Sequence, residues 1–118
     1  MLPNREQPEP ALIDISEGEP KVDIKDTKMD EEMQAEAVRV AKRALRTCTT
    51  TSDAAKKIKR TFDNEHEPIW ECVVGTEFGA HVTHEADEYY TYFYVGRYAV
   101  LLFRVSVFMT GMTGMTGM

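Results

Sequence analysis

The sequence predicts an α+β domain with the element order β-α-α-β-β-β-β. This order is predicted by the spacing of apolar residues, which changes once along the chain. Between residues 33 and 62, apolar side chains recur every three or four positions, which is the spacing of amphipathic helices. From residue 69 onward the period becomes two, and aromatic and β-branched residues accumulate, as they do in strands. A chain of 118 residues has room for one such domain.

A short strand and a long helix are predicted for the first part of the domain. Val22 and Ile24 alternate with charged residues, which favours a strand. Asp30 is expected to cap the helix that follows, because two glutamates occupy the first turn, where the helix dipole stabilises acids. The expected buried stripe of this helix consists of Met33, Ala37, Val38, Ala41, Ala44, Leu45 and Cys48.

A second helix is expected after the polar residues 49–52. Ser52 is its predicted N-cap, and Pro68 prevents it from continuing further. Its expected buried face consists of Ala54, Ala55, Ile58 and Phe62.

Four strands are predicted after Pro68. Trp70, Cys72 and Val74 lie on one face of the first of them. Gly96 and Arg97 have the character of a tight hairpin turn. The other three strands are predicted at residues 78–83, 89–95 and 98–103, the last with room to extend to residue 108.

Both ends of the chain differ from this domain in composition. Residues 1–20 hold four of the five prolines and five acids, and residues 109–118 end in a Thr-Gly-Met repeat. Neither segment carries enough apolar surface to offset the entropy of ordering it. We therefore expect a disordered acidic arm at 1–20, a folded domain at 21–108 and a flexible tail at 109–118.

Composition argues against two classes of partner. With a formal charge of -6 and a pI near 5.0, the chain lacks the basic excess that binds nucleic acid, and the basic cluster within residues 56–60 is more simply a solvated helix face. No apolar run approaches the roughly 20 residues of a membrane helix, and the first residues lack the character of a secretory signal. We expect a cytoplasmic protein with no nucleic-acid or membrane partner. Cys48 and Cys72 fit reduced thiols in such a protein.

One segment offers candidate metal ligands. His81, His84 and Glu85, with Cys72 as a further donor, could in principle hold zinc. The predicted strand opposes this arrangement, because residues three apart in a strand point to opposite faces. The sequence contains no nucleophile elbow and no glycine-rich phosphate loop, so we predict no catalytic residues, no cofactor and no enzymatic activity. A histidine-based metal-binding protein remains a remote alternative.

A tyrosine-rich run, YYTYFY at residues 89–94, has two interpretations. In a basic protein it could stack nucleic-acid bases. In an acidic protein such a run more often lines a sheet core or a protein interface, where the tyrosine ring packs and its hydroxyl stays paired or hydrated.

Several motifs in a fixed order resemble the eight-kilodalton dynein light chains. They are KMDEEMQ at 28–34, IKRTFD at 58–63, WECVVG at 70–75, FG at 78–79, VTHE at 82–85, YFYVG at 92–96 and AVLLF at 99–103. The resemblance covers about residues 22 to 106. It implies two helices packed on an antiparallel sheet in a strand-swapped homodimer, whose free sheet edges bind short peptides by strand addition.

The resemblance also implies the residues that contact the peptide. Residues 79–83 would form the pairing edge, and the start of the second helix would receive a glutamine of the peptide, because a helix start has unpaired N–H groups. The complete implied set is Lys25, Thr51, Ser52, Phe78, Gly79, Ala80, His81, Val82, Thr83, His84, Tyr92 and Tyr94. The implied dimer interface contains Glu71, Phe78, Val82 and Thr83.

The partners implied by the resemblance are dynein intermediate chain and other proteins with short linear motifs containing Gln and Thr, on the microtubule cytoskeleton. Three departures from the family pattern bear on this expectation. Thr50 and Ser52 are unusual near the groove, and one extra residue lies between Glu85 and Tyr92. Glu71 stands where well-known members have an interface histidine, so we expect a dimer without acid-triggered dissociation. The alternative is a divergent paralogue that serves axonemal or non-motor assemblies.

Overall fold

The computed structural model describes residues 10–14, 16, 18–76 and 89–105. Two helices and four strands lie within these residues. They are β1 (Val22–Thr27), α2 (Glu31–Thr47), α3 (Thr51–Glu65), β2 (Trp70–Gly75), β3 (Tyr90–Val95) and β4 (Tyr98–Arg104). Among the described residues, no helix has both the length and the apolar character needed to cross a membrane.

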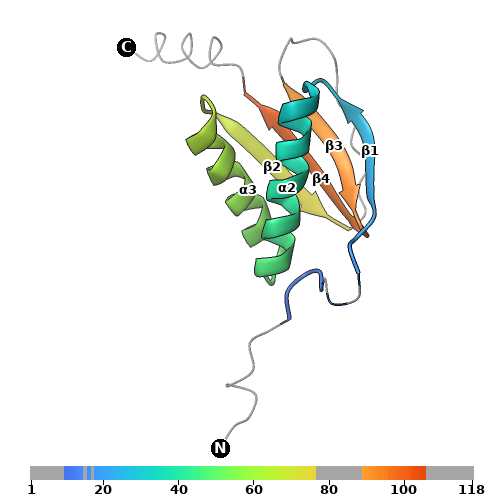
Figure 1. Ribbon diagram of the computed structural model, residues 1–118. Coiled ribbons are helices and arrows are strands. Elements are labelled where there is room, and N and C mark those ends of the chain that lie inside the picture. Colours follow the sequence, from blue (N-terminus) through green and yellow to red (C-terminus); the bar gives the residue numbers. More distant parts are fainter. Residues whose placement is uncertain (1–9, 15, 17, 77–88, 106–118) are drawn as a thin grey trace, which may run out of the picture.

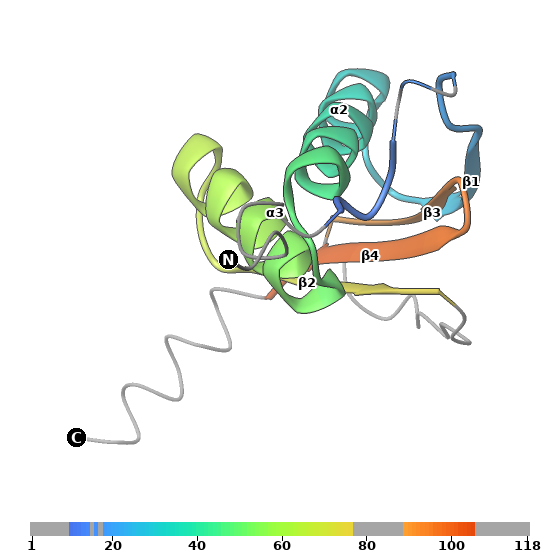
Figure 2. The same cartoon turned by 90° about the horizontal axis from the view of Figure 1, so that it is seen from below.

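The four strands form one antiparallel sheet in the order β1-β3-β4-β2 (Figure 1). Both helices pack on the same face of this sheet, α3 over β2 and α2 against α3 and β3 (Figure 2). The two helices and four of the five predicted strands thus occur in the predicted order, and the predicted α+β class is confirmed. The further strand predicted at residues 78–83 lies outside the described residues.

Helix α2 begins and packs as its sequence predicts. The Asp30 side chain caps the helix by accepting a hydrogen bond from the Met33 N–H at 2.8 Å. Ala37, Ala41, Ala44 and Leu45 are fully buried, at the three- and four-residue spacing of one helix face. The other predicted members of the stripe pack against the core while partly buried; they are Met33, Val38 and Cys48.

The predicted N-cap of the second helix is wrong by two residues. Thr50, rather than Ser52, occupies the cap position of α3, and its hydroxyl accepts a hydrogen bond from the Asp53 N–H at 3.1 Å. Ser52 lies inside the first turn and is exposed. Residues 49–52 are all Thr or Ser, so every one of them has a side chain able to cap, and local chemistry does not select among them.

We expect Thr50→Ala to lower the free energy of unfolding by about 1 kcal/mol, the usual cost of losing a Ser or Thr cap. Ser52→Ala is the matched control, because it deletes a hydroxyl two residues away that caps nothing, and a change within about 0.5 kcal/mol is expected. Urea unfolding followed by circular dichroism measures both. Equal losses in the two variants, or a larger loss for Ser52→Ala, would contradict the assigned cap.

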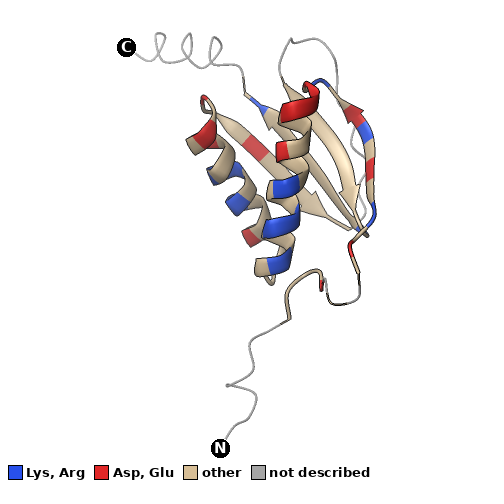
Figure 3. Ribbon diagram, viewed as in Figure 1, with Lys and Arg blue, Asp and Glu red and all other residues tan. Residues whose placement is uncertain are grey.

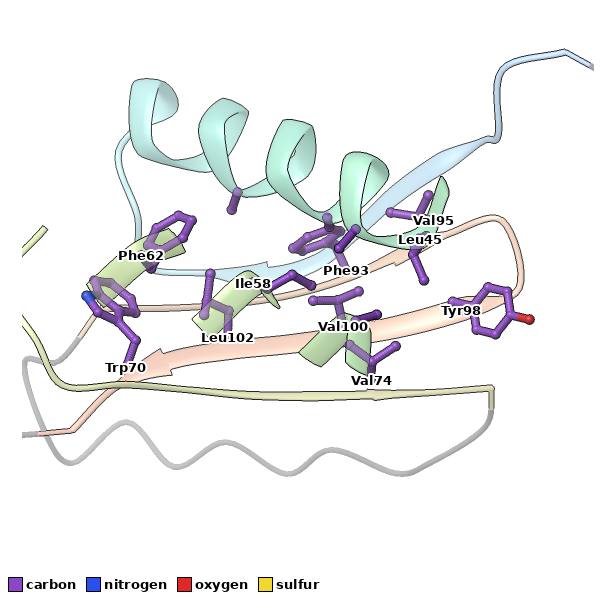
Figure 4. Close-up of a cluster of buried hydrophobic side chains, with 14 of the residues drawn as sticks. Leu45, Ile58, Phe62, Trp70, Val74, Phe93, Val95, Tyr98, Val100 and Leu102 are labelled. Carbon is purple, nitrogen blue, oxygen red and sulfur yellow. The ribbon is translucent and has the colours of Figure 1, made fainter. Parts of the chain in front are cut away.

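The hydrophobic core lies between the helices and the sheet (Figure 4). Phe62 of α3 is fully buried and packs edge-on against Trp70 of β2, with 4.9 Å between ring centroids. Trp70 and Val74 are buried on the helix side, and Cys72 packs against the same cluster, as the period of two predicts. The largest fully buried hydrophobic side chains are Trp70, Phe62, Phe93, Leu45, Ile58, Leu102, Val95 and Val100.

The hairpin between β3 and β4 has the predicted two-residue turn. Val95 and Tyr98 are paired across it, so Gly96 and Arg97 are its two loop residues. Gly96 has φ +60°, a conformation that glycine adopts without steric cost and that a two-residue turn can require at its first position.

One buried polar contact joins α2 to the sheet. The Thr91 hydroxyl of β3 donates to the Gln34 side-chain oxygen at 2.6 Å, and both residues are buried. The contact offsets part of the cost of burying two polar groups in the core. It also fixes the register of α2 against β3, because each side chain needs the other as partner.

Residues 11–13 extend the packed structure beyond the predicted domain. The N–H groups of Leu12 and Ile13 donate to the carbonyl oxygens of Cys48 and Leu45, at 3.0 and 3.1 Å, and both side chains pack on the core. These bonds satisfy carbonyl groups at the end of α2 that have no partner within the helix. The expected disorder of the 1–20 arm therefore does not extend to Leu12 and Ile13. Residues 1–9 and 109–118 lie outside the described residues.

Candidate functional site

The sheet face opposite the helices is rich in aromatic and aliphatic side chains, and we call it the open face. Its members alternate with the buried residues along β2, β3 and β4 and lie in cross-strand register with one another. They are Glu71, Val73, Tyr90, Tyr92, Tyr94, Ala99, Leu101 and Phe103. Figure 2 shows both helices on the other side of the sheet.

Several side chains of the open face stay in contact with solvent in the single chain. Val73, on the edge strand β2, is 45% exposed, and its register partner Leu101 on β4 is half-buried. Phe103, Tyr92 and Tyr94 are also half-buried. A contiguous apolar and tyrosine-rich patch of this kind is typical of a protein–protein interface.

Glu71, the predicted interface residue of β2, lies on the open face. It is exposed and stands in register opposite Phe103 of β4. The structure thus places an acid at the margin of the open face.

Two predicted peptide-binding residues, Lys25 and Tyr94, meet at the β1 edge of the open face. The Lys25 ammonium group lies 5.8 Å from the centroid of the Tyr94 ring and 2.9 Å from the Asp23 carboxylate. A β-bulge between Ile24 and Asp26 interrupts the pairing of β1 with β3 at Lys25. The Asp23 carboxylate raises the pKa of Lys25, which keeps its charge at neutral pH.

This edge contains a shallow cleft of about 260 Å³, lined by Lys21, Asp23, Lys25, Tyr94 and Gly96. Tyr92 is next to it, with its ring centroid 6.0 Å from that of Tyr94. A hydrogen bond with Tyr94 raises the pKa of the Tyr92 phenol, and burial adds to the shift. The Tyr92 phenol is therefore an uncharged hydrogen-bonding group at neutral pH, suited to a polar peptide.

The start of α3 offers a different kind of contact. Asp53 and Ala54 donate their N–H groups to the Thr50 hydroxyl and carbonyl. The N–H groups of Thr51 and Ser52 precede them and have no acceptor among the described residues. An outside carbonyl group, such as that of a glutamine side chain, is a suitable acceptor for them.

Within a single chain, the contact residues at the β1 edge and those at the start of α3 lie far apart. Thr51 and Ser52 belong to the helix that packs on β2, whereas Lys25 belongs to β1. These strands are the two outermost of the sheet, three strand spacings or roughly 14 Å apart. Helix α3 also lies on the opposite side of the sheet from the open face. The remaining predicted contact residues lie outside the described residues; they are Phe78, Gly79, Ala80, His81, Val82, Thr83 and His84.

The described part of the chain contains no group of three or more His, Cys, Asp or Glu side chains placed to hold a metal. His81, His84 and Glu85 lie outside it. Cys72 packs against the core, and burial raises the pKa of its thiol, with the Glu71 carboxylate adding to the shift. Both effects oppose the deprotonation that a zinc-bound thiolate requires.

Sequence reasoning missed Asp23 and Asp26 as partners of the site. Asp23 holds Lys25, and Asp26 accepts a hydrogen bond from the Tyr90 hydroxyl at 3.2 Å. Burial raises the pKa of Tyr90, and the Asp26 carboxylate raises it further. The alternation of charged and apolar residues in β1 was the available signal, since it places Asp23 two positions from Lys25.

Comparisons with known proteins identify the family of this chain and agree with its fold. A family model described as dynein light chain type 1 matches residues 21–105. A solved structure of the dynein light chain-like domain of the Fasciola hepatica calcium binding protein FhCaBP2 is similar, with a TM-score of 0.67 and 22% identity over 80% of this chain and 98% of that chain. A mercury derivative of the same domain gives a TM-score of 0.64 and 23% identity over 72% of this chain and 92% of that chain.

Proposed function

Because this chain belongs to the dynein light chain type 1 family, we propose that it is a non-enzymatic light chain of the dynein motor complex and acts as a dimeric hub for short peptides. Its partners are dynein intermediate chain and other proteins that carry Gln- and Thr-containing linear motifs. Its location is the cytoplasm, on the microtubule cytoskeleton. The observation that carries this proposal is the open face of the sheet.

The open face supports a dimer because a second copy can cover it. Val73, Leu101 and Phe103 would otherwise stay partly in water, at a cost proportional to their apolar area. A two-fold axis through the face would bring the same patch of each copy against the other. Tyrosine and aliphatic side chains are common at the centre of such contacts.

The separation of the two candidate contact groups supports a groove made from both copies. Lys25, Tyr92 and Tyr94 lie on the open face, and the α3 start lies beside the opposite sheet edge. A short peptide that uses both groups therefore needs one from each protomer. Binding of the peptide then depends on the dimer.

Strand β2 supports binding by strand addition. It pairs with β4 on one side and, among the described strands, with none on the other. Such an edge presents unpaired N–H and C=O groups that an extended segment can meet. In the proposed dimer the partner's residues 78–83 pair here and carry the peptide on their own free edge.

We do not propose calcium binding for this chain. The similar Fasciola hepatica protein is named as a calcium binding protein, and the solved part is its dynein light chain-like domain. No cluster of three potential ligands exists in residues 10–14, 16, 18–76 and 89–105 of this chain to favour such a role. Calcium in the titration buffer is accordingly expected to have no effect on peptide binding.

The proposal is tested by calorimetric titration with a short peptide that carries Thr-Gln-Thr, next to the same peptide with Gln replaced by Ala. We expect one peptide per chain for the native sequence and at least a tenfold weaker interaction for the Ala control, since the α3 N–H groups lose their acceptor. Sedimentation of the same sample is expected to show a dimer. A monomer, or equal binding of both peptides, would contradict the proposed groove.

A folded dimer that binds neither peptide would favour the divergent paralogue. Recovery of dynein intermediate chain in a pull-down with the purified dimer distinguishes the motor-bound protein from an axonemal or non-motor paralogue.

A further inference from the structure

Positive charge is concentrated in one stretch of this acidic chain. Residues 39–60 contain eight Lys and Arg and a single acid, Asp53, for a formal charge of +7. The remaining residues carry six bases and nineteen acids, for a formal charge of -13. The net value of -6 therefore conceals two regions of opposite sign.

The fold brings the two helix segments that carry these bases together, and we call the solvent-exposed side of this helix pair the basic face. Residues 39–47 form the second half of α2 and residues 51–60 the first part of α3. The two segments touch, because the Lys57 ammonium group donates to the Thr47 hydroxyl at 3.1 Å. Figure 3 shows the blue turns next to one another on the two helices. The members are Arg39, Lys42, Arg43, Arg46, Lys56, Lys57, Lys59 and Arg60.

Folding alone does not account for this concentration of charge. Like charges stand four residues apart in three pairs, Arg39 with Arg43, Lys42 with Arg46, and Lys56 with Arg60, and such pairs weaken a helix. The helix dipole favours Arg46, in the last turn of α2, but the last turn of α3 contains no base.

Most of these bases also lack an acidic partner. Lys42 pairs with Glu19 at 3.2 Å and Lys59 with Asp63 at 2.6 Å. The other six members of the basic face form no ion pair with any residue that the structure describes. They are available to an anion from outside.

A cleft between the two helices is lined by three of these six bases. It has a volume of about 160 Å³ and lies between Arg39 and Arg43 of α2 and Lys57 and Thr61 of α3, with Val40 as the apolar contribution. Two guanidinium groups can each meet a carboxylate through paired N–H donors. The Lys57 ammonium group has three donors, of which Thr47 receives one.

We propose that the basic face is a second docking surface of this protein and binds an acidic segment of a partner protein, one carboxylate of which lies in the cleft among Arg39, Arg43 and Lys57. The surface already contacts one acid of an acidic segment, since Glu19 from the arm pairs with Lys42. This surface is separate from the open face, because it lies on the helices, on the other side of the sheet. It therefore allows a second partner to bind while the peptide grooves are filled.

Two observations favour an acidic protein segment over other polyanions. The formal charge of -13 outside residues 39–60 opposes a long, uniformly charged nucleic acid that extends past the basic face. The large exposed hydrophobic side chains of the described residues are Ile24, Val73 and Tyr89, and both helices lack one, so the basic face has no group to insert into a membrane. A short acidic segment matches the size and the charge of the surface.

The test uses the full-length chain and a fluorescein-labelled octaglutamate peptide, followed by fluorescence anisotropy at low salt. We expect binding that octaglutamine does not show and that weakens as sodium chloride is raised from 50 to 300 mM. The double variant Arg39→Gln/Arg43→Gln is expected to bind the acidic peptide at least tenfold more weakly. Glutamine preserves the helix and removes a like-charge pair, so this variant is expected to fold.

The matched control is Arg5→Gln/Arg97→Gln, which removes the same charge from outside the basic face and is expected to change the affinity less than twofold. The Thr-Gln-Thr peptide is expected to bind the helix variant as it binds the native chain, which separates this inference from the proposed groove. Equal affinity of the two double variants for octaglutamate overturns the inference. So does a short DNA duplex or an anionic lipid vesicle that displaces octaglutamate at equal charge concentration, because the surface would then bind polyanions without selection.

Discussion

Val73→Lys is expected to leave the chain folded but monomeric, and binding of the Thr-Gln-Thr peptide is expected to be lost with the dimer. Val73 is 45% exposed in the single chain, so a lysine there keeps its charge in water and the monomer tolerates it. In the proposed dimer the same position is covered by the second copy, and each copy would bury an unpaired ammonium group. The cost of desolvating a charge is several kcal/mol. We expect the dimer dissociation constant to rise at least a hundredfold, by sedimentation at several protein concentrations.

Ile24→Lys is the matched control for that substitution. Ile24 is also a β-branched residue on an edge strand and is also 45% exposed, but it is in register with the buried Phe93 on the helix side of the sheet, whereas Val73 is in register with Leu101 on the open face. Its substitution introduces the same charge and is expected to leave the dimer intact. If Ile24→Lys dissociates the protein as strongly as Val73→Lys, the interface is not the open face. If neither does, the dimer uses another surface.

Phe62→Ala is expected to lower the free energy of unfolding by about 3–5 kcal/mol. Phe62 is fully buried, and its ring contacts both the Trp70 indole, at 4.9 Å between centroids, and the His66 imidazole, at 5.0 Å. The substitution removes the side chain that joins the end of α3 to the start of β2. Because a domain of this size is stable by only about 5–15 kcal/mol, the variant should be close to unfolding at 37 °C.

Trp70 reports on this loss directly, as the single tryptophan of the chain. Urea unfolding followed by its fluorescence measures the change, and all variants are compared at the same protein concentration because dimer formation adds a concentration-dependent contribution to the apparent stability. Phe62→Leu is the comparison variant and is expected to cost less, because leucine fills most of the volume. A loss below about 1 kcal/mol for Phe62→Ala would mean that Phe62 and Trp70 do not form the centre of the core.

Much of the fold follows from periodicity, as particular residues illustrate. Ala37, Ala41 and Ala44 of α2 are buried as their spacing predicts, and so are Trp70 and Val74 of β2. A regular helix or strand fixes the direction of each side chain. The exceptions depend on contacts distant in sequence. Gln34 is buried because Thr91, 57 residues away, meets its side chain, and no local pattern contains that information.

Two other differences between the predicted and the observed fold have local causes. Thr50, Thr51 and Ser52 are nearly equivalent as caps, so sequence located the start of α3 only within two residues. Leu12 and Ile13 lie among prolines and acids, whose average composition indicates disorder, although two apolar side chains suffice to contact the core. The composition of a segment is an average over its residues, whereas packing on the core depends on single side chains.

The candidate site was predictable in part. Lys25, Tyr92 and Tyr94 lie close to one another because β1 and β3 are paired, and their contact with a peptide stays a prediction. Their separation from Thr51 and Ser52 was not foreseen, since it depends on the strand order of the sheet. Strand order is set by packing of the whole chain and cannot be read from the sequence of any one strand.

Because Leu12 and Ile13 contact α2, the segment that packs as one domain is longer than the segment that matches the family. The family match begins at residue 21, yet two carbonyl groups at the end of α2 accept their hydrogen bonds from residues 12 and 13. A fragment cut at the family boundary would expose both carbonyl groups and the apolar side chains beneath them. For any study of this domain in isolation, the first residue retained should therefore precede Pro10, and an affinity tag should be joined upstream of that point.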